Sequence, residues 1–418
     1  MKKIIYNRFL FSIAVLFSVL IYFTGCTDKG SPSLYQGIPS GPVGATPSIS
    51  SINPPDVALA GVTEITITGT NFSSVPSQNL VYFNGIAGTV TASSPTQLTV
   101  ISPNVFGDTV EIKVAELNSE LFSNSILYKL KQAAENLYPD SKSTFILPFS
   151  ITFDNAGNLY ISATTNAVGT GIQKVNPDDL KGITDYASKG AETFWNSMKF
   201  GPGGVLYTAR SVKAIFQIPA GGGAPGTFLV LKENASITQL DFDANHFLWA
   251  GGKADSLYRI NVSNKEYKGF ASSGKVSALR VFDNYLYVAQ QVDSLTTIKR
   301  YPIDSNNDLG PAESYFDFSG KYGANYLVNA IDFSADGDMY LGTNLTNPII
   351  VVHADKTSQP LYPSILESAA AISFAWGNGN YLYYVRSKVT DVNSNILVPQ
   401  TIVKLDLLKP GAPYYGNN

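Results

Sequence analysis

The chain has 418 residues, of which 44% are apolar and 15% are charged, and its formal net charge is −3. A typical globular domain has about 25% charged residues, so the composition excludes a disordered polyelectrolyte, and the charge balance does not support nucleic-acid binding. Two His and one Cys exclude zinc fingers, Cys/His metal clusters and a disulfide framework.

Length and residue types predict an all-β chain with more than one part. This length accommodates about two to four domains, or one small domain followed by a large repeat fold. The 24 Tyr, 23 Phe, 35 Gly and 23 Pro residues favour strands and tight turns over helices.

The N-terminus has the pattern of a secreted, lipid-anchored protein. Three basic residues precede an apolar run over 9–23, which is shorter than the about 20 residues that a spanning helix needs. The run ends in YFTGC, which resembles the lipobox of bacterial lipoproteins, although Tyr22 stands where Leu is usual; such looseness is common in Bacteroidetes-like bacteria. The resemblance implies a signal peptide over 1–25 and lipidation of Cys26. The alternative is an ordinary secretory signal with an unrelated Cys.

Residues 26–46 are rich in Gly, Ser and Pro and have no apolar period, which predicts a tether between the lipid and the folded body. Residue 27 is Thr, not the Asp that resembles an inner-membrane retention signal in enterobacteria. We therefore expect a cell-envelope protein on the outer membrane, lipid-anchored and facing outward, with its membrane affinity supplied by the acyl chains.

Short alternating runs over 47–130 predict a β-sandwich. The expected strands are 64–68, 79–83, 97–101 and 109–114. The motifs INPP (52–55), GTNF (69–72) and VYFNG (81–85) resemble those of the IPT/TIG family, an immunoglobulin-like family. The resemblance implies a spacer or a protein-contact module, and it transfers no catalytic residue.

A unit of strand, Asp/Asn/Gly turn and strand recurs six times in the remainder of the chain. Each unit carries an anchoring aromatic residue, is followed by a third strand, and in the first five units by a fourth. Four strands per unit predict a six-bladed β-propeller over 137–408. Because the sixth unit lacks its fourth strand, we expect residues 137–145 to supply it and close the ring. The anchoring aromatics are Tyr160, Tyr207, Trp249, Tyr287, Tyr340 and Tyr383.

The segments DNAGNLY (154–160) and DGDMY (336–340) are similar to the core of the NHL repeat, whose propellers include gluconolactonase-like enzymes. The Asp and the Arg or His that usually follow the second NHL strand are mostly absent. We interpret the repeated aromatics as residues that pack the blades, not as a ladder of ligand contacts.

In propellers, ligands generally meet the face formed by the interblade loops and the loops between second and third strands. These loops carry amides, charged groups and rings, which suit sugars or polypeptides. Trp195 could equally be a ligand platform or a wedge between blades. The candidates are Trp195, Arg210, Lys253, Asp255, Tyr322, Asn325, Tyr326 and Arg386.

The hypothesis of an enzymatic function has weaker support. Gluconolactonase-like propellers hold a divalent cation with Glu, Asp and Asn, and this chain has Asp241, Asp332 and Asn329 near inner strands but no Glu at the start of the first. His246 and His353 fall on different strands and are not expected to meet. The sequence therefore predicts no catalytic residue, no metal and no cofactor.

We expect a non-enzymatic surface protein that captures a glycan through the propeller's loop face, beside an outer-membrane transporter. The alternatives are a protein–protein adhesion or scaffold module and a metal-dependent, gluconolactonase-like hydrolase.

Overall fold

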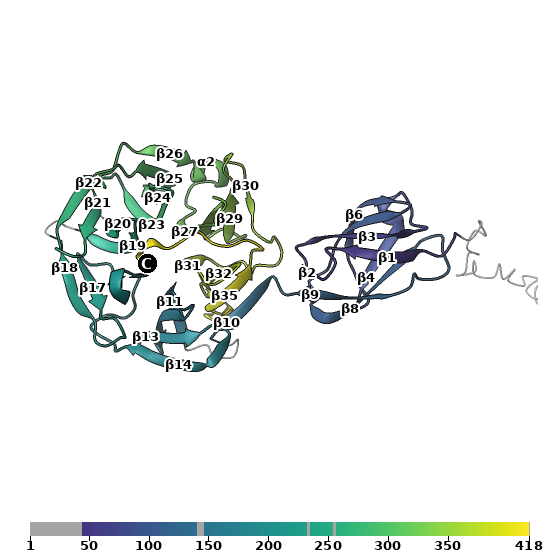
Figure 1. Ribbon diagram of the computed structural model, residues 1–418, viewed down its shortest axis with the longest axis horizontal. Coiled ribbons are helices and arrows are strands. Elements are labelled where there is room, and N and C mark those ends of the chain that lie inside the picture. Colours follow the sequence, from purple (N-terminus) through teal and green to yellow (C-terminus); the bar gives the residue numbers. More distant parts are fainter. Residues whose placement is uncertain (1–43, 140–145, 232–234, 254–255, 418) are drawn as a thin grey trace, which may run out of the picture.

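The computed structural model describes residues 44–139, 146–231, 235–253 and 256–417. A small sandwich lies beside a larger disc (Figure 1). The prediction of an all-β chain with a sandwich followed by a six-bladed propeller is confirmed. The predicted signal peptide, Cys26 and most of the predicted tether lie outside the described residues. None of the described helices is long and apolar enough to cross a bilayer.

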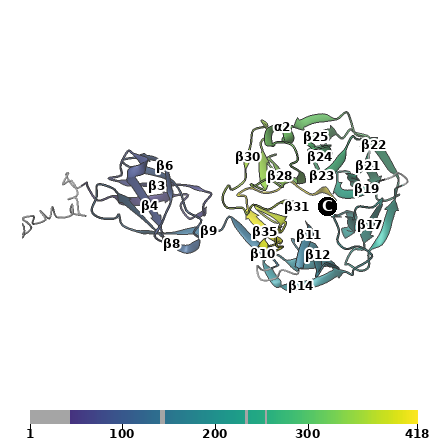
Figure 2. The same cartoon turned by 180° about the vertical axis from the view of Figure 1, so that it is seen from behind.

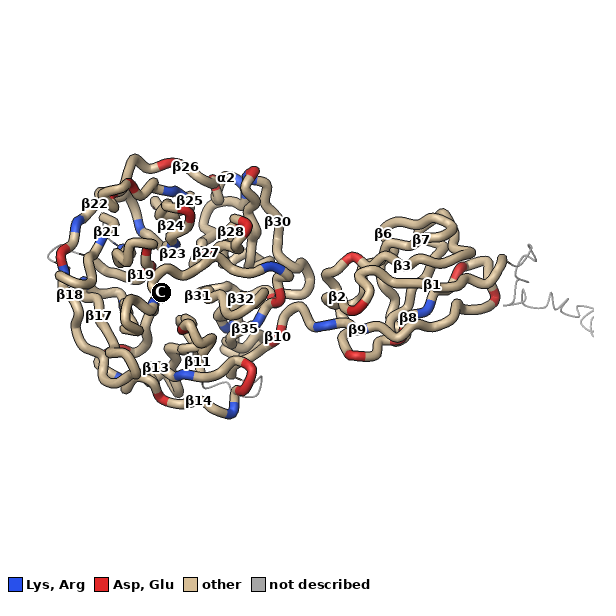
Figure 3. The backbone as a smooth tube through the Cα atoms, in the orientation of Figure 1, with Lys and Arg blue, Asp and Glu red and all other residues tan. Residues whose placement is uncertain are grey.

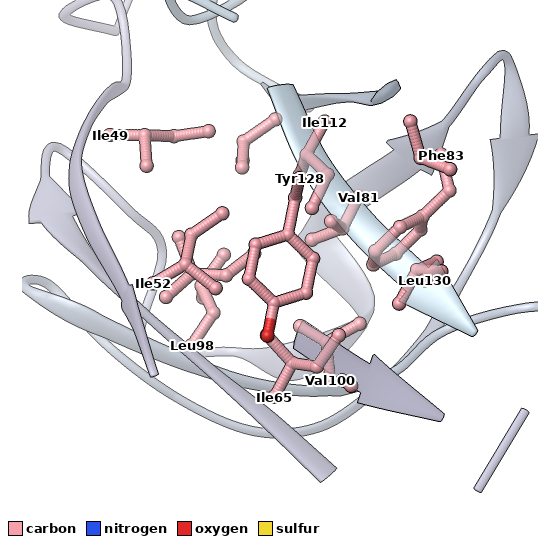
Figure 4. Packing of buried hydrophobic residues seen from close by; sticks show 14 of the residues in the cluster. Ile49, Ile52, Ile65, Val81, Phe83, Leu98, Val100, Ile112, Tyr128 and Leu130 are labelled. Atoms are coloured by element: carbon pink, nitrogen blue, oxygen red, sulfur yellow. The ribbon is translucent and has the colours of Figure 1, made fainter. Parts of the chain in front are cut away.

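Two sheets form the sandwich, because apolar residues alternate along each strand and face inward. Ile65, Val81 and Ile112 are fully buried between them, and the ring of Tyr128 crosses this core to donate a hydrogen bond from its hydroxyl to Pro54 O at 2.7 Å (Figure 4). One sheet has the order β1 (Ser48–Asn53), β3 (Glu64–Thr70), β7 (Gln97–Ile101), β6 (Thr89–Ser94). The other has the order β2 (Val57–Leu59), β9 (Ile126–Lys131), β8 (Gly107–Glu116), β4 (Asn79–Phe83), β5 (Ile86–Ala87).

In the described part of the chain, six four-stranded antiparallel sheets surround the axis of the disc. The first blade is β11 (Ile146–Phe153), β12 (Leu159–Thr165), β13 (Val168–Asn176) and β14 (Asp179–Ala187). The second is β15 (Ser197–Phe200), β16 (Leu206–Ala209), β17 (Ala214–Ile218) and β18 (Gly226–Val230). The third is β19 (Ser236–Phe242), β20 (Phe247–Lys253), β21 (Ser256–Asn261) and β22 (Tyr267–Ala271).

The second half of the ring repeats this plan. The fourth blade is β23 (Lys275–Phe282), β24 (Tyr285–Val292), β25 (Leu295–Pro302) and β26 (Glu313–Phe316), followed by the short helix α2 (Phe318–Tyr322). The fifth is β27 (Val328–Phe333), β28 (Met339–Thr343), β29 (Ile349–Val352) and β30 (Ser358–Pro360). The sixth is β31 (Ala371–Trp376), β32 (Tyr381–Arg386), β35 (Thr401–Asp406) and the upstream strand β10 (Ala134–Tyr138), with a hairpin of β33 (Val389–Thr390) and β34 (Ile396–Val398) inserted after β32.

An upstream strand does close the ring, but it lies earlier than expected. β10 pairs antiparallel with β35, from Ala134 opposite Leu405 to Tyr138 opposite Ile402. The sequence placed this strand over 137–145, across Pro139, and residues 140–145 of that prediction lie outside the described residues. Because proline has no N–H to donate to a ladder, the strand ends before it.

The chain continues past the expected end of the propeller at 408. Residues 409–417, which we call the C-terminal tail, run from the sixth blade to the centre of the disc (Figures 1 and 2). Ala335 N donates to Pro410 O at 2.9 Å, and Ala412 N donates to Phe333 O at 2.9 Å. These bonds hold the tail on the face where first and second strands are joined.

The sandwich meets the disc beside the loop between the fifth and sixth blades. Gly61 has φ +70, and a Cβ there would lie 2.7 Å from Ile365 Cδ1. The left-handed backbone favours glycine at this contact, and a side chain there would also displace the end of Ile365.

Candidate functional site

The mouth of the central channel, on the interblade-loop face, is a ring of one residue from each blade. In five of the six inner strands a β-bulge falls at this residue, for example between Pro148 and Ser150 and between Val328 and Ala330. A bulge adds an unpaired residue and re-aims its side chain. The six residues, which we call the mouth ring, are Phe149, Asn196, Thr238, Ser277, Asn329 and Ile372.

The mouth ring and Gln239 form the floor of a cavity of about 360 Å³, which we call the funnel. The remaining lining of the funnel is Phe194, Ser211, Ser236, Lys253 and Lys275. Below it the channel narrows to a space of about 40 Å³ that shares Asn196, Gln239 and Asn329 with the funnel. A ligand can therefore enter from the loop face without passing through the disc.

One wall of the funnel is aromatic. The rings of Phe149 and Phe194 stack with centroids 3.9 Å apart and planes 9° apart, and both side chains are half-buried. This pair holds two rings in one orientation at the cavity edge. Such a surface suits contact with an apolar C–H face.

The floor of the funnel carries two side-chain amides. Gln239 Nε2 donates to Ser277 O at 2.9 Å, and Asn329 Nδ2 donates to Ala371 O at 3.3 Å. Because the two amide nitrogens are directed to the backbone, the amide oxygens remain for a ligand. Acceptors fixed in this way suit hydroxyl donors.

A second ring, of charged residues, lies deeper in the channel. Residues opposite four of the anchoring aromatics carry alternating charge: Lys199, Asp241, Arg280 and Asp332. Arg280 Nη1 lies 2.9 Å from Asp241 Oδ2, and Arg280 Nε lies 3.0 Å from Asp332 Oδ1. Lys199 Nζ lies 3.7 Å from Asp241 Oδ1. Each charge thus has an opposite neighbour in a site shielded from water, as a buried charge requires.

The tail closes the channel at this charged ring. The Tyr414 hydroxyl donates to Asp332 Oδ2 and accepts from Trp376 N at 2.9 Å. The Tyr414 ring lies 4.3 Å from Lys199 Nζ and 4.3 Å from the Arg280 guanidinium carbon. Figure 1 shows the tail reaching the centre of the disc, where the Tyr414 ring covers the charged ring at the far end of the funnel.

Burial sets the protonation of this cluster. Burial and the neighbouring Asp332 raise the pKa of Tyr414 well above its ordinary value. Burial lowers the pKa of Lys199, although Asp241 opposes the shift. Burial would also lower the pKa of Arg280, but Asp241 and Asp332 outweigh it and raise that pKa.

The carboxylates that the sequence suggested as cation ligands already form ion pairs within the protein. Asp241 and Asp332 both accept from Arg280, whereas Asn329 belongs to the mouth ring above them. His353 Nδ1 lies 2.8 Å from Asp338 Oδ1, and His246 lies in the turn after β19, away from the channel. Within the described residues, no group of three or more His, Cys, Asp or Glu could hold a metal ion.

Two of the predicted ligand residues are packing residues. Trp195 is 1% exposed and lies between the first and second blades, with its ring 5.2 Å from that of Phe216. Arg386 is 3% exposed, and its Nη2 donates to Pro399 O at 3.3 Å; burial lowers its pKa. Neither side chain presents a surface to a ligand, so the wedge alternative describes Trp195.

The other candidates are scattered. The Arg210 guanidinium covers the Phe216 ring at 4.8 Å, and the Tyr322 hydroxyl shares a hydrogen bond of 2.7 Å with Ser358 Oγ. Asn325 and Tyr326 are exposed in the loop between the fourth and fifth blades. Among the eight candidates, Lys253 is the one that the described structure brings to the funnel. Asp255 and Cys26 lie outside the described residues.

Sequence reasoning singled out Asp241, Asp332 and Asn329 near the inner strands, but it missed that they belong to two rings, and it missed the tail. Both rings have a signal in the sequence, because each member stands at a constant offset before the anchoring aromatic of its unit, shortened by one residue in the fourth unit. Comparing the six units at these offsets would have found them.

A larger cavity lies at the opposite face, between the first and second blades. It measures about 650 Å³, and its lining includes Asp154, Lys174, Tyr186 and Asn417. The Asp154 carboxylate already accepts from Tyr160 at 2.9 Å and from Asn158 at 2.8 Å. The carboxylate at the centre of this lining is therefore already paired within the protein.

Residues 47–129 match the IPT/TIG domain family. No curated protein matches the chain. A putative phosphatase from Bacteroides thetaiotaomicron VPI-5482 has a TM-score of 0.55 and 13% identity, over 87% of this chain and 97% of that one. A luciferin-regenerating enzyme has a TM-score of 0.52 and 16% identity, over 68% and 98%. An auxiliary nutrient binding protein from Bacteroides thetaiotaomicron VPI-5482 has a TM-score of 0.46 and 13% identity, over 86% and 97%. At these identities the likeness to the first two structures shows the fold alone.

Proposed function

We propose that this chain, with its N-terminal IPT/TIG domain and its propeller, is a non-enzymatic binding protein that captures a glycan in the funnel. The observation that carries the proposal is the pairing of two stacked rings, Phe149 and Phe194, with fixed amide acceptors in one blind cavity.

This pairing matches the two kinds of surface on a sugar. The apolar C–H face of a pyranose packs on an aromatic ring, while its hydroxyls need hydrogen-bond partners when they leave water. Gln239 and Asn329 supply acceptor oxygens to those hydroxyls. Ser211, Ser236 and Thr238 add hydroxyl groups around them.

The proposed setting is the bacterial cell surface. The signal sequence over 1–25 and the lipobox-like end at Cys26 support a lipid anchor on the outer membrane. Residues 26–46 and the sandwich would hold the propeller away from the bilayer. Glycan capture at such a place serves uptake, which supports an outer-membrane transporter as the partner.

A protein partner is the second candidate, favoured by exposed aliphatic residues on the same face. They lie in the segments that join second to third strands: Val168, Val212, Val292, Leu295, Val392 and Leu397. These residues come from four blades and offer apolar contact area on the loop face to a macromolecule. Adhesion and docking to a transporter would both use this surface.

Isothermal titration against plant, algal and host polysaccharides tests glycan capture. Phe149→Ala should weaken binding of the best ligand, whereas Phe106→Ala, at an exposed ring of the sandwich, should not. If none of these polysaccharides binds, the result would favour a protein partner. Stoichiometric calcium or zinc in the purified protein would instead support the metal-dependent hydrolase.

A further inference from the structure

Two lysines from neighbouring blades border the funnel. Lys253 is the last residue of β20 in the third blade, and Lys275 is the first residue of β23 in the fourth. Both side chains are exposed and line the cavity. Two cationic groups therefore stand at the rim of one binding site.

No carboxylate balances them in the described lining of the funnel. Neither ammonium forms an ion pair with any described carboxylate, whereas Lys268, Lys404 and Lys409 all do. Figure 3 shows both signs of charge interspersed around the disc, so the excess of positive charge is local to the funnel. Asp255, near Lys253 in sequence, lies outside the described residues.

The floor and the rim of the funnel therefore favour different chemical groups on a ligand. The floor presents the amide oxygens of Gln239 and Asn329, which accept from hydroxyl groups. The rim presents ammonium groups, which only donate and bind anions best. A neutral sugar has no anionic group for the lysines of the rim. An acidic polypeptide has few hydroxyl groups for the amide oxygens of the floor and no sugar C–H face for the stacked rings.

We infer that the ligand is an acidic glycan, whose carboxylate or sulfate group binds between Lys253 and Lys275 while its hydroxyls meet the floor of the funnel. This inference rests on glycan capture, and it adds the chemical class of the glycan. Carboxylate and sulfate share the charge that the lysines recognise.

Matched pairs of probes test the charge. Oligogalacturonate is compared with its carboxyl-reduced, neutral form, and a sulfated galactan oligosaccharide with its desulfated form, by isothermal titration. We expect the acidic member of at least one pair to bind at least tenfold more tightly, and this preference to shrink as added salt screens the charges. The pair that shows the preference identifies the anionic group.

Variants of the two lysines test whether the anionic group binds between them. Lys253→Gln and Lys275→Gln should each weaken binding of the acidic member about fivefold, the upper range for an exposed ion pair. The double variant should bind both members of the pair about equally. Lys181→Gln, at an exposed lysine of the outer strand β14, should change nothing.

The outcomes separate the inference from the function beneath it. Equal binding of neutral and acidic members, unaffected by the lysine variants, would overturn the acidic class and leave glycan capture standing. Binding of none of the four oligosaccharides or of the wider panel would overturn both. Oligoglutamate binding as tightly, with the same lysine dependence, would overturn the inference in favour of a polypeptide.

Discussion

Replacing Arg280 by Met should lower the propeller's free energy of unfolding by about 3–5 kcal/mol, the usual effect of removing one partner from a buried ionic group. The Arg280 side chain is 1% exposed and binds the carboxylates of Asp241 and Asp332 at 2.9 and 3.0 Å. It also donates to Val281 O at 2.7 Å and to Pro413 O at 2.9 Å. Met retains much of the volume and removes all of these bonds.

The expected size follows from what remains around the site. Without Arg280, two buried carboxylates face one ammonium, Lys199, which lies 3.7 Å from Asp241. The double variant Arg280→Met with Asp332→Asn leaves one balanced pair. It should therefore be less destabilised than Arg280→Met alone, since no uncompensated charge stays buried.

Urea denaturation monitored by tryptophan fluorescence measures these changes, because Trp195, Trp249 and Trp376 all lie in the propeller. Arg300→Met is the control: its ion pair with Glu313, at 2.7 Å, is partly exposed and should contribute no more than about 1 kcal/mol. An Arg280→Met protein within 1 kcal/mol of wild type would refute the reasoning, as would a double variant less stable than the single one.

Three further predictions follow from the tail and the funnel. Tyr414→Phe should destabilise the propeller by about 1–3 kcal/mol in the same assay, because it leaves buried partners without their hydroxyl bonds; an unchanged midpoint would contradict the closed channel. Burial opposes ionisation of Asp336, but hydrogen bonds from Lys409 and Ser334 outweigh it and lower the pKa of that carboxyl below 3.8. The bond of Lys409 to Asp336 should therefore stabilise the fold above about pH 4 and be lost as the pH falls through the lowered pKa. Lys409→Met should make the free energy of unfolding less dependent on pH below about pH 4. An unchanged pH dependence would argue against a stabilising bond between these two residues. Asn329→Ala should weaken glycan binding about tenfold by titration, from the loss of one buried hydrogen bond; undiminished affinity would remove the acceptor floor from the account.

The propeller could be predicted from the sequence because its determinants are repeated. Each unit carries an aromatic residue, such as Tyr160 or Trp249, that is buried between blades in the structure. Six copies of one apolar pattern leave few alternatives to a closed ring. The sequence also predicts the strand that closes the ring, but the strand begins at Ala134, three residues before the predicted start, and its last paired residue precedes Pro139.

Most of the candidate site could not be predicted from residue type alone. Trp195 is a residue type that often stacks on ligands, yet its position beside the inner strand of the second blade buries it between blades. The mouth ring depends on bulges, which direct Asn329 and its equivalents toward the funnel. Its members share an offset from the anchoring aromatic but no residue type, so residue type alone does not reveal them. Tyr414 lies beyond the last repeat, so its role emerges only from the path of the tail.

A crystal structure of the protein with the tightest-binding oligosaccharide tests the central claim most directly. The account predicts the sugar in the funnel, with a ring against Phe149 and Phe194 and hydroxyls on Gln239 and Asn329. A sugar seated instead in the cavity beside Asp154 and Tyr186, on the opposite face, would contradict it.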